Sequence, residues 1–253
     1  MGFYAPAQIV ADLKRHGVQV YPIDVCHSDW ECTLEHGNDE EAAVALRLGL
    51  RLVKGLSRDA GERIVAARNT AAFTQVADLV NRARLGQRGR DALARADALR
   101  GLAGHRHQAQ WQIAAAHVHA DLFAGLDAPE PDVDLPAPKE GSDIVADYAS
   151  TALTLRRHPL ALLRPQLARQ GVLCARDFDA LADRRAAHVA GLVTIRQRPG
   201  SAKGTTFVTL EDETGMSNIV VYSDLAERQR QRQRYYSGSQ AAKNISPEVR
   251  KIK

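Results

Sequence analysis

VKGLSRDAGERIVAAR at residues 53–68 and LGQRGRDALARA at residues 85–96 share one pattern. Each stretch has a glycine-containing turn directly before a segment with the apolar spacing of a helix. Ser57 is a suitable N-cap for the first of these helices. The two stretches therefore predict a pair of helix–hairpin–helix units in tandem. An ordinary helical bundle with glycine turns is the alternative.

A helix–hairpin–helix unit can bind a DNA phosphate through the backbone N–H groups at the start of its second helix. Glycine lets the phosphate approach the backbone, and the helix dipole favours an anion. Such contacts do not depend on base sequence and weaken with salt. The candidate DNA-binding residues of the two turns are Lys54, Gly55, Ser57, Arg58, Gly86, Arg88 and Arg90.

Helical spacing extends over much of the chain. The predicted helices cover residues 6–16, 57–68, 73–82, 87–96, 105–122, 142–157 and 159–171. Thr74 and Ser142 are predicted N-caps, and Pro6 and Pro159 suit the first turn of a helix. Trp111 is expected on the buried face of its helix.

The segment from Val44 to Val53 has a different period. Leucine and valine alternate there with other residues, which predicts a half-buried strand. Because leucine and alanine also favour helices, a helix is the alternative interpretation.

The bulk composition of the 253 residues is that of a soluble globular protein, with 45% hydrophobic and 25% charged residues. No apolar run approaches the roughly 20 residues that a membrane-spanning helix needs, so no membrane partner is expected. The N-terminal stretch MGFYAPAQIVADLKRHG lacks the apolar region of a signal peptide. Three cysteines cannot form a disulfide framework, so a reduced, cytoplasmic setting is expected.

The net charge of +4 is unevenly distributed. Seven arginines lie within residues 82–107, and further basic blocks lie within 184–203 and 224–253. Eight acids lie within residues 121–147, which include a proline-rich stretch predicted to be a linker. Basic blocks on folded segments suit nucleic acid. Solvated helix faces are the alternative.

From residue 187 onward the sequence is typical of strands. HVAGLVTIRQR, TTFVTLEDE and SNIVVY are rich in Val, Ile and Thr and are separated by turns, which predicts a β-meander. Three such strands resemble the opening half of an OB-fold, a barrel that binds single strands through a basic groove and aromatic stacking. The candidate residues are Arg196, Arg198, Lys203 and Phe207. Alternatively, Phe207 is a core residue and the basic residues only solubilise a turn.

Other motifs carry little chemistry. Cys26, His27, Cys32 and His36 lack a CxxC pair and a second pair of ligands, so no metal site is predicted. The chain has no P-loop, nucleophile elbow or HExxH motif, so no catalytic residue is predicted.

HADLF at residues 119–123 could insert into the apolar pocket of a partner protein. A helix end that covers its own core is the alternative. The candidate partner-binding residues are His119, Asp121, Leu122 and Phe123.

Taken together, the sequence resembles the C-family bacterial DNA polymerases, which include the DNA polymerase III alpha subunit. The resemblance covers residues 1–227 and rests on segments such as LRLGLRLVKGLSRDAGERIVAAR and VAGLVTIRQRPGSAKGTTFVTLEDETGMSNIVVY. Three segments are most similar to the error-prone branch used in damage-induced mutagenesis. They are RQRPGSAKG, LEDETG and the preceding DIVADYASTALTLRRHPLALLR.

The resemblance implies an α+β chain that is the C-terminal portion of such a polymerase. The implied parts are the end of the fingers region (1–40), a tandem helix–hairpin–helix domain (41–123), a Pro/acid-rich linker (124–141), a helical connector (142–183), a partial OB-fold barrel (184–227) and a disordered tail (228–253). The family often has glycine where this chain has Ser57, a departure that would weaken phosphate binding there.

The resemblance also implies that the catalytic aspartates and their Mg²⁺ belong to a palm domain upstream of Met1. This chain would then have no catalytic residue and no cofactor, and would bind primer–template DNA and single-stranded template. His119 replaces the glutamine that begins the sliding-clamp motif of replicative relatives. Clamp contact is therefore expected only indirectly, through translesion accessory proteins. The alternative function is a non-enzymatic adaptor that docks such partners through residues 119–123 and 142–169.

Overall fold

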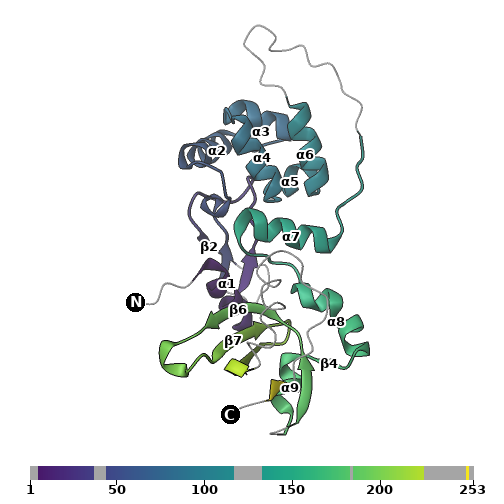
Figure 1. The fold of residues 1–253 in the computed structure, drawn as a ribbon. Coiled ribbons are helices and arrows are strands. Elements are labelled where there is room, and N and C mark those ends of the chain that lie inside the picture. The colour runs from purple at the N-terminus through teal and green to yellow at the C-terminus, as the bar shows by residue number, and fades with distance from the viewer. Residues whose placement is uncertain (1–4, 37–43, 117–132, 183–184, 225–248, 251–253) are drawn as a thin grey trace. The chain divides into compact units, whose positions relative to one another are not determined.

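The structure is a computed structural model, and it describes residues 5–36, 44–116, 133–182, 185–224 and 249–250. The chain divides into two compact units, Met1–Arg156 and Arg157–Lys253. Helices and small sheets both contribute (Figure 1), so the predicted α+β class is confirmed. The motif at 119–123, the first half of the predicted linker (124–132) and most of the tail lie outside the described residues.

The first unit begins with a helix and a small mixed sheet. Helix α1 (Pro6–Arg15) starts at a proline in its first turn, as predicted. Strands β1 (Gln19–Tyr21), β2 (Thr33–Glu35) and β3 (Ala45–Arg47) form a sheet in the order β1-β3-β2. Strand β3 is parallel to β1 and antiparallel to β2.

The long strand predicted from Val44 to Val53 is wrong beyond Arg47. Strand β3 ends there, and the 3-10 helix η1 (Leu50–Leu52) follows. A side chain at Gly49 would clash with the backbone of Glu31, so the chain makes a close backbone contact at this point. The backbone N–H of Leu50 donates to the Asp29 carbonyl at 2.8 Å, so this segment bonds to a loop and not to a neighbouring strand.

Five helices follow and lie together in Figure 1. They are α2 (Arg58–Thr70), α3 (Val76–Arg82), α4 (Gln87–Arg95), α5 (Arg100–Ala103) and α6 (Arg106–Ala115). Their apolar spacing builds one core, whose fully buried side chains include Leu50, Val53, Ile64, Leu79, Val80, Leu85, Leu93 and Leu99.

Local signals located some of these helix ends and missed others. Ser57 caps α2 as predicted, because its Oγ accepts a hydrogen bond from the Ala60 N–H at 3.3 Å. The prediction for Thr74 is wrong, because Gln75 is the N-cap of α3. The prediction that Trp111 lies on the buried face of its helix is also wrong, since this residue is 46% exposed.

Helix α7 (Glu140–Thr151) is joined to the five helices through a buried ionic cluster. Arg106, only 4% exposed, donates to the carboxylates of Asp143 and Asp147 on α7. Arg156 bonds to Asp97 at 2.8 Å and to Asp143 at 3.2 Å. Burial raises the pKa of Asp97, and the neighbouring arginines oppose that shift. We call these five residues the ionic cluster.

Both predicted ends of α7 are corrected by the structure. Ser142 lies inside the helix, and Lys139 is the N-cap. The helix ends at Thr151 and not at Arg157, because Ala152 takes a left-handed conformation with φ of 65°.

The second unit combines two helices with two small sheets. Its helices are α8 (Pro159–Arg169), which begins at the predicted proline, and α9 (Ala175–Ala180). One sheet joins β4 (Val172–Leu173), β5 (Ala186–Val189) and β9 (Val249–Arg250). The other is the predicted meander of β6 (Leu192–Gln197), β7 (Thr206–Glu211) and β8 (Met216–Val221), which is antiparallel throughout. These small, open sheets agree with a partial OB-like fold.

Asp212, in the turn between β7 and β8, ties the second unit together. Its carboxylate accepts hydrogen bonds from the N–H groups of Thr214 and Ala175, both at 2.7 Å. Arg164 of α8 donates to the same carboxylate at 3.0 Å and also pairs with Glu213. Burial raises the pKa of Asp212, but these hydrogen bonds and the Arg164 cation outweigh it and lower the pKa below its usual value.

We expect Arg106→Met to lower the free energy of unfolding of the first unit by about 3–5 kcal/mol, because it leaves buried carboxylates without their main cation. Arg100→Met removes an exposed partner of Asp97 and is the matched control, with an expected loss below about 1 kcal/mol. Urea titrations followed by tryptophan fluorescence report on this unit, since Trp30 and Trp111 both belong to it. Equal losses for the two variants would contradict a buried ionic cluster.

The second unit is expected to lose stability as the pH falls below about 4. The hydrogen bond from Arg164 lowers the pKa of Glu213, and the pKa of Asp212 is also lowered, so both carboxylates stabilise the fold only while ionised. Amide hydrogen exchange at Thr214 and Gly215, measured from pH 5 to pH 3 and divided by the intrinsic rate at each pH, should show a loss of protection in the native chain. In Asp212→Asn the protection should be low throughout, and an unchanged pH profile in that variant would refute this role.

Candidate DNA-backbone interface

The two predicted hairpins have the same backbone design. In the first, Gly55 has φ of 92° and is followed by the buried Leu56. In the second, Arg84 has φ of 48° and is followed by the buried Leu85. A left-handed residue lets the chain reverse after a helix, and the apolar residue after it anchors the turn in the core. The next residue in each hairpin, Ser57 or Gly86, is the N-cap of the following helix.

The first turn packs against the second helix of the second hairpin. A Cβ added to Gly55 would lie 3.7 Å from the Ala92 Cβ and 3.9 Å from the Arg88 Nε. A Cβ added to Gly89 would lie 3.6 Å from the Leu56 Cδ1. The first turn therefore lies directly beside the beginning of α4.

The beginning of α4 has the chemistry of an anion site. Its N-cap, Gly86, carries no side chain, and a Cβ added there would meet no atom within 4 Å. Among the described residues, none accepts a hydrogen bond from the N–H groups of Gln87 and Arg88. The first turn of α4 contains no acid. Open N–H groups and the positive end of the helix dipole together favour a phosphate.

Two arginines stand beside this helix end. Arg84 and Arg88 are both exposed, and in the described part of the chain no hydrogen bond or ion pair engages either guanidinium. Arg84 did not stand out in the sequence, because glycine is the residue expected at a left-handed position. Both cations are available to an anion that approaches from solvent.

The beginning of α2 differs in its side chains. The Ser57 Oγ already accepts the N–H of Ala60, and Asp59 places a carboxylate in the first turn. Arg58 pairs with Glu62 at 2.7 Å, and both side chains are exposed. An acid in the first turn interacts favourably with the helix dipole and repels a second anion.

Two other candidate residues make internal contacts. The Lys54 Nζ donates to the carbonyl oxygens of Tyr148 and Ala149, at 3.2 and 3.0 Å. The Arg90 Nη1 donates to the Ala116 carbonyl at 2.8 Å, at the carboxyl end of α6. The sequence could not reveal these contacts, because both join residues far apart along the chain.

In the second unit, strand register separates two of the candidate residues. Phe207 lies opposite Gln197 and Val220, whereas Arg196 lies opposite Val208. Because successive residues of a strand point to opposite faces, Arg196 and Phe207 belong to opposite faces of this sheet. Phe207 is 42% exposed, as predicted for an outward aromatic residue.

The remaining candidates lie near the turn between β6 and β7. Arg198 follows β6, and Lys203 has a left-handed conformation after the short 3-10 helix η3 (Gly200–Ala202). Both side chains are exposed.

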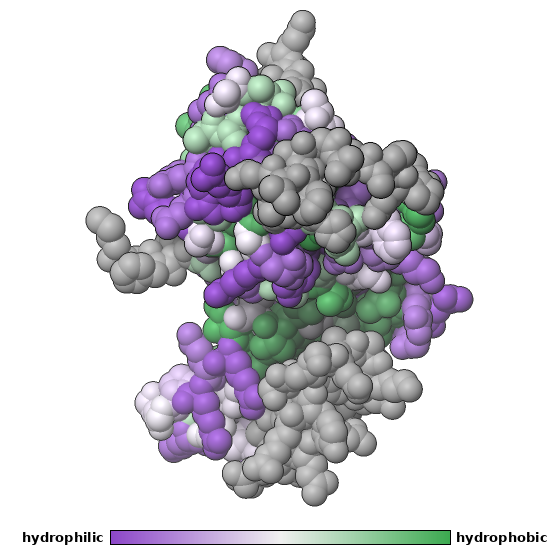
Figure 2. Space-filling view, turned by 90° about the horizontal axis from the view of Figure 1, so that it is seen from above, coloured by the Kyte–Doolittle hydropathy of each residue, from purple (hydrophilic) through white to green (hydrophobic). Residues whose placement is uncertain are grey.

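In the view of Figure 2, hydrophilic side chains cover much of the described surface.

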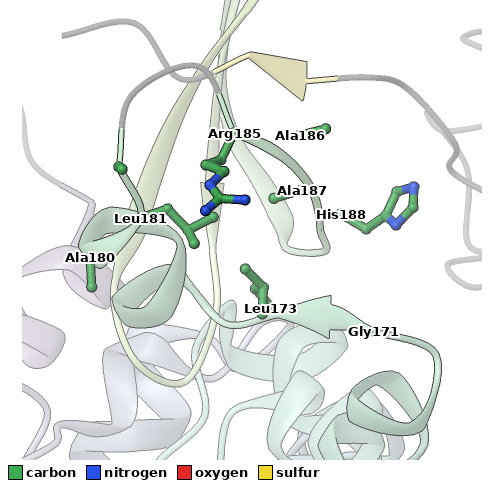
Figure 3. A pocket seen from close by; sticks show the side chains of 9 residues that line it. Gly171, Leu173, Ala180, Leu181, Arg185, Ala186, Ala187 and His188 are labelled. Carbon is green, nitrogen blue, oxygen red and sulfur yellow. The ribbon is translucent and has the colours of Figure 1, made fainter.

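A hollow of about 450 Å³ is also present in the second unit. Figure 3 shows Leu173, Leu181 and Arg185 around it, with the ring of His188 off to one side. Among the described residues that line it, none is a carboxylate that could work with the histidine. Within the described residues no three His, Cys, Asp or Glu side chains gather as a metal site would require, and no helix has the length and apolarity to cross a bilayer.

The comparisons with known proteins agree with this geometry. A family model described as a helix-hairpin-helix motif matches residues 17–109. The error-prone DNA polymerase of Alkalilimnicola ehrlichii is 54% identical over 230 residues, which are 91% of this chain and 22% of that protein. The chain is homologous to error-prone DNA polymerases. The sequence-based resemblance is thereby confirmed.

Further error-prone DNA polymerases match over the same share of the chain. Those of Aromatoleum aromaticum and Pseudomonas fluorescens (strain Pf-5) are each 52% identical over 91% of it. The chain spans 22% and 23% of their lengths, about a fifth of an error-prone polymerase.

Proposed function

We propose that this chain is the DNA-handling part of an error-prone DNA polymerase and that it binds the backbone of primer–template DNA. The observation that carries the proposal is the open beginning of α4, with its glycine N-cap and no acid in its first turn. A phosphate there would accept hydrogen bonds from the backbone N–H groups of Gln87 and Arg88. The guanidinium groups of Arg84 and Arg88 would add charge.

Binding of this kind reads no base sequence. Contacts to phosphates set the position of a protein on a duplex, and each neutralised phosphate releases counterions. A polymerase must hold every template sequence equally, so backbone contacts suit the part that grips DNA behind the point of synthesis.

The sheet β6-β7-β8 supports a second contact, to single-stranded template. The exposed ring of Phe207 offers a surface on which a base can stack. Arg198 and Lys203 would meet the phosphates nearby. Arg196 belongs to the other face, so we assign it no base contact.

In the whole polymerase this grip would serve DNA synthesis across damaged template in the bacterial cytoplasm, with accessory proteins linking the enzyme to the sliding clamp. The chemistry would come from a palm domain outside this chain. The chain alone should therefore bind a primer–template without extending it. Nucleotide incorporation by this chain in a primer-extension assay with Mg²⁺ would overturn that part of the proposal.

Gly86→Asp tests the α4 site without disturbing the fold. Aspartate is a favourable N-cap, so stability should be retained or rise by a few tenths of a kcal/mol. Its carboxylate would take the open N–H groups and repel phosphate. Duplex affinity should fall about tenfold, because charge-assisted hydrogen bonds contribute about 1.5–3 kcal/mol. The measurement is fluorescence anisotropy with two duplexes of unrelated sequence.

Gly104→Asp is the matched control, since Gly104 is a glycine of the same unit in open space. Its φ of 78° and ψ of −48° lie outside the left-handed helical region that aspartate tolerates, so the substitution is expected to cost about 1–3 kcal/mol of stability, and affinity is measured where the variant is fully folded. This control adds the same charge away from α4 and should change affinity by less than about threefold. Equal losses in the two variants would mean that general charge, and not the α4 site, governs binding.

A further inference from the structure

The carboxyl end of α7 lies on the first hairpin. The backbone N–H of Lys54 donates to the Ser150 carbonyl at 2.9 Å. The Nζ of the same residue donates to the carbonyls of Tyr148 and Ala149. One residue of the turn thus satisfies three carbonyl oxygens in the last turn of a helix.

The carbonyls of Ala149 and Ser150 need an outside partner, whereas the Tyr148 carbonyl also accepts the N–H of the C-cap residue Ala152 at 3.2 Å. The last four carbonyls of a helix have no intrahelical donor, and they carry about half a negative charge at the end of the helix dipole. Helix α7 has no basic residue in its own last turn. Lys54 of the hairpin places its ammonium group at this negative helix end. In a phosphate-binding turn, a lysine at this position would place the same charge beside a phosphate.

The other half of α7 is held by the ionic cluster. Asp143 and Asp147 accept from Arg106, whose Nε also donates to the Arg95 carbonyl at 3.0 Å. The Ser150 Oγ bonds back to the Ala146 carbonyl at 2.7 Å. Helix α7 is therefore fixed to the helical unit near both of its ends.

We propose that the two hairpins have divided roles: the first is an internal anchor that holds the carboxyl end of α7, and the second binds the DNA phosphate. The DNA half of this inference rests on the proposed function. Asp59, Ser57 and the Arg58–Glu62 pair at the beginning of α2 fit the anchor, because they leave that helix end without net positive charge for an incoming anion. Through α7, the anchor fixes the point at which the chain leaves the first unit at Arg156.

The test compares Lys54→Met with Arg88→Met, each of which removes one cation from a hairpin. Two quantities are measured on the full chain: amide hydrogen exchange in residues 144–152, and duplex affinity as a function of salt. Lys54→Met should accelerate exchange in that segment at least tenfold, while duplex affinity stays within about twofold and the salt slope is unchanged. Lys54→Arg should restore slow exchange.

Arg88→Met should show the opposite behaviour, with native exchange in α7 and a salt slope reduced by about 0.9, the value for one lost phosphate contact. A reduced salt slope in Lys54→Met with native exchange in α7 would overturn the divided roles. If the native chain fails to bind duplex DNA, the proposed function falls, and the exchange arm still decides whether Lys54 anchors α7.

Discussion

The helical unit depends on a reversal of the backbone through single left-handed residues. One helix ends just before Arg84 and another just before Asp97, and φ is positive at both residues. The N–H group of the residue that follows donates to a carbonyl five residues earlier, from Leu85 to Val80 and from Ala98 to Leu93. This bond satisfies helix-end carbonyls inside the core. It also sends the chain directly into the next helix. At Arg84 and Gly55 the helix that follows begins with exposed residues, Gly86 and Gln87 in one case and Ser57 and Arg58 in the other.

A non-glycine residue at such a position carries a conformational cost of about 1–2 kcal/mol. The full burial of Leu85 in the core offsets a cost of that size, since burying a leucine contributes about 1.5–3 kcal/mol. The arginine side chain is directed to solvent beside the α4 N-terminus, where a glycine would leave no charge. The same residue thus completes the turn and adds a cation to the candidate interface.

The two hairpins show how one backbone design supports two chemistries. With glycine as N-cap and arginine in the first turn, the end of α4 is open and positive. With serine as N-cap and aspartate in the first turn, the end of α2 satisfies one N–H and neutralises its own dipole. The adjoining lysine then binds the end of α7. Side chains at three or four positions, and not the fold, separate a phosphate site from an internal anchor.

Much of this architecture could be predicted from local sequence. Ser57 marked a helix start, Pro6 and Pro159 marked two more, and the Val/Ile/Thr runs marked the meander. The errors arose where distant residues decide the outcome. Strand β3 ends at Arg47, and at Gly49 the chain passes too close to the backbone of Glu31 for any side chain, which periodicity cannot detect.

The candidate site divides in the same way. Glycine turns followed by arginines indicated where phosphate would bind, since that chemistry is local. The positive φ of Arg84, the contact of Lys54 with α7 and the opposite faces of Arg196 and Phe207 depend on tertiary packing or on strand register. These features determine which of the basic residues face an outside ligand.

The central claim is that backbone N–H groups at the beginning of α4 bind a DNA phosphate. Amide chemical shifts of the ¹⁵N-labelled chain, followed during titration with duplex DNA of arbitrary sequence, observe those groups directly. The account predicts that the largest changes occur at Gly86, Gln87 and Arg88 and that Arg58 and Asp59 change little. Largest changes at the beginning of α2, with Gln87 and Arg88 unmoved at saturation, would contradict it.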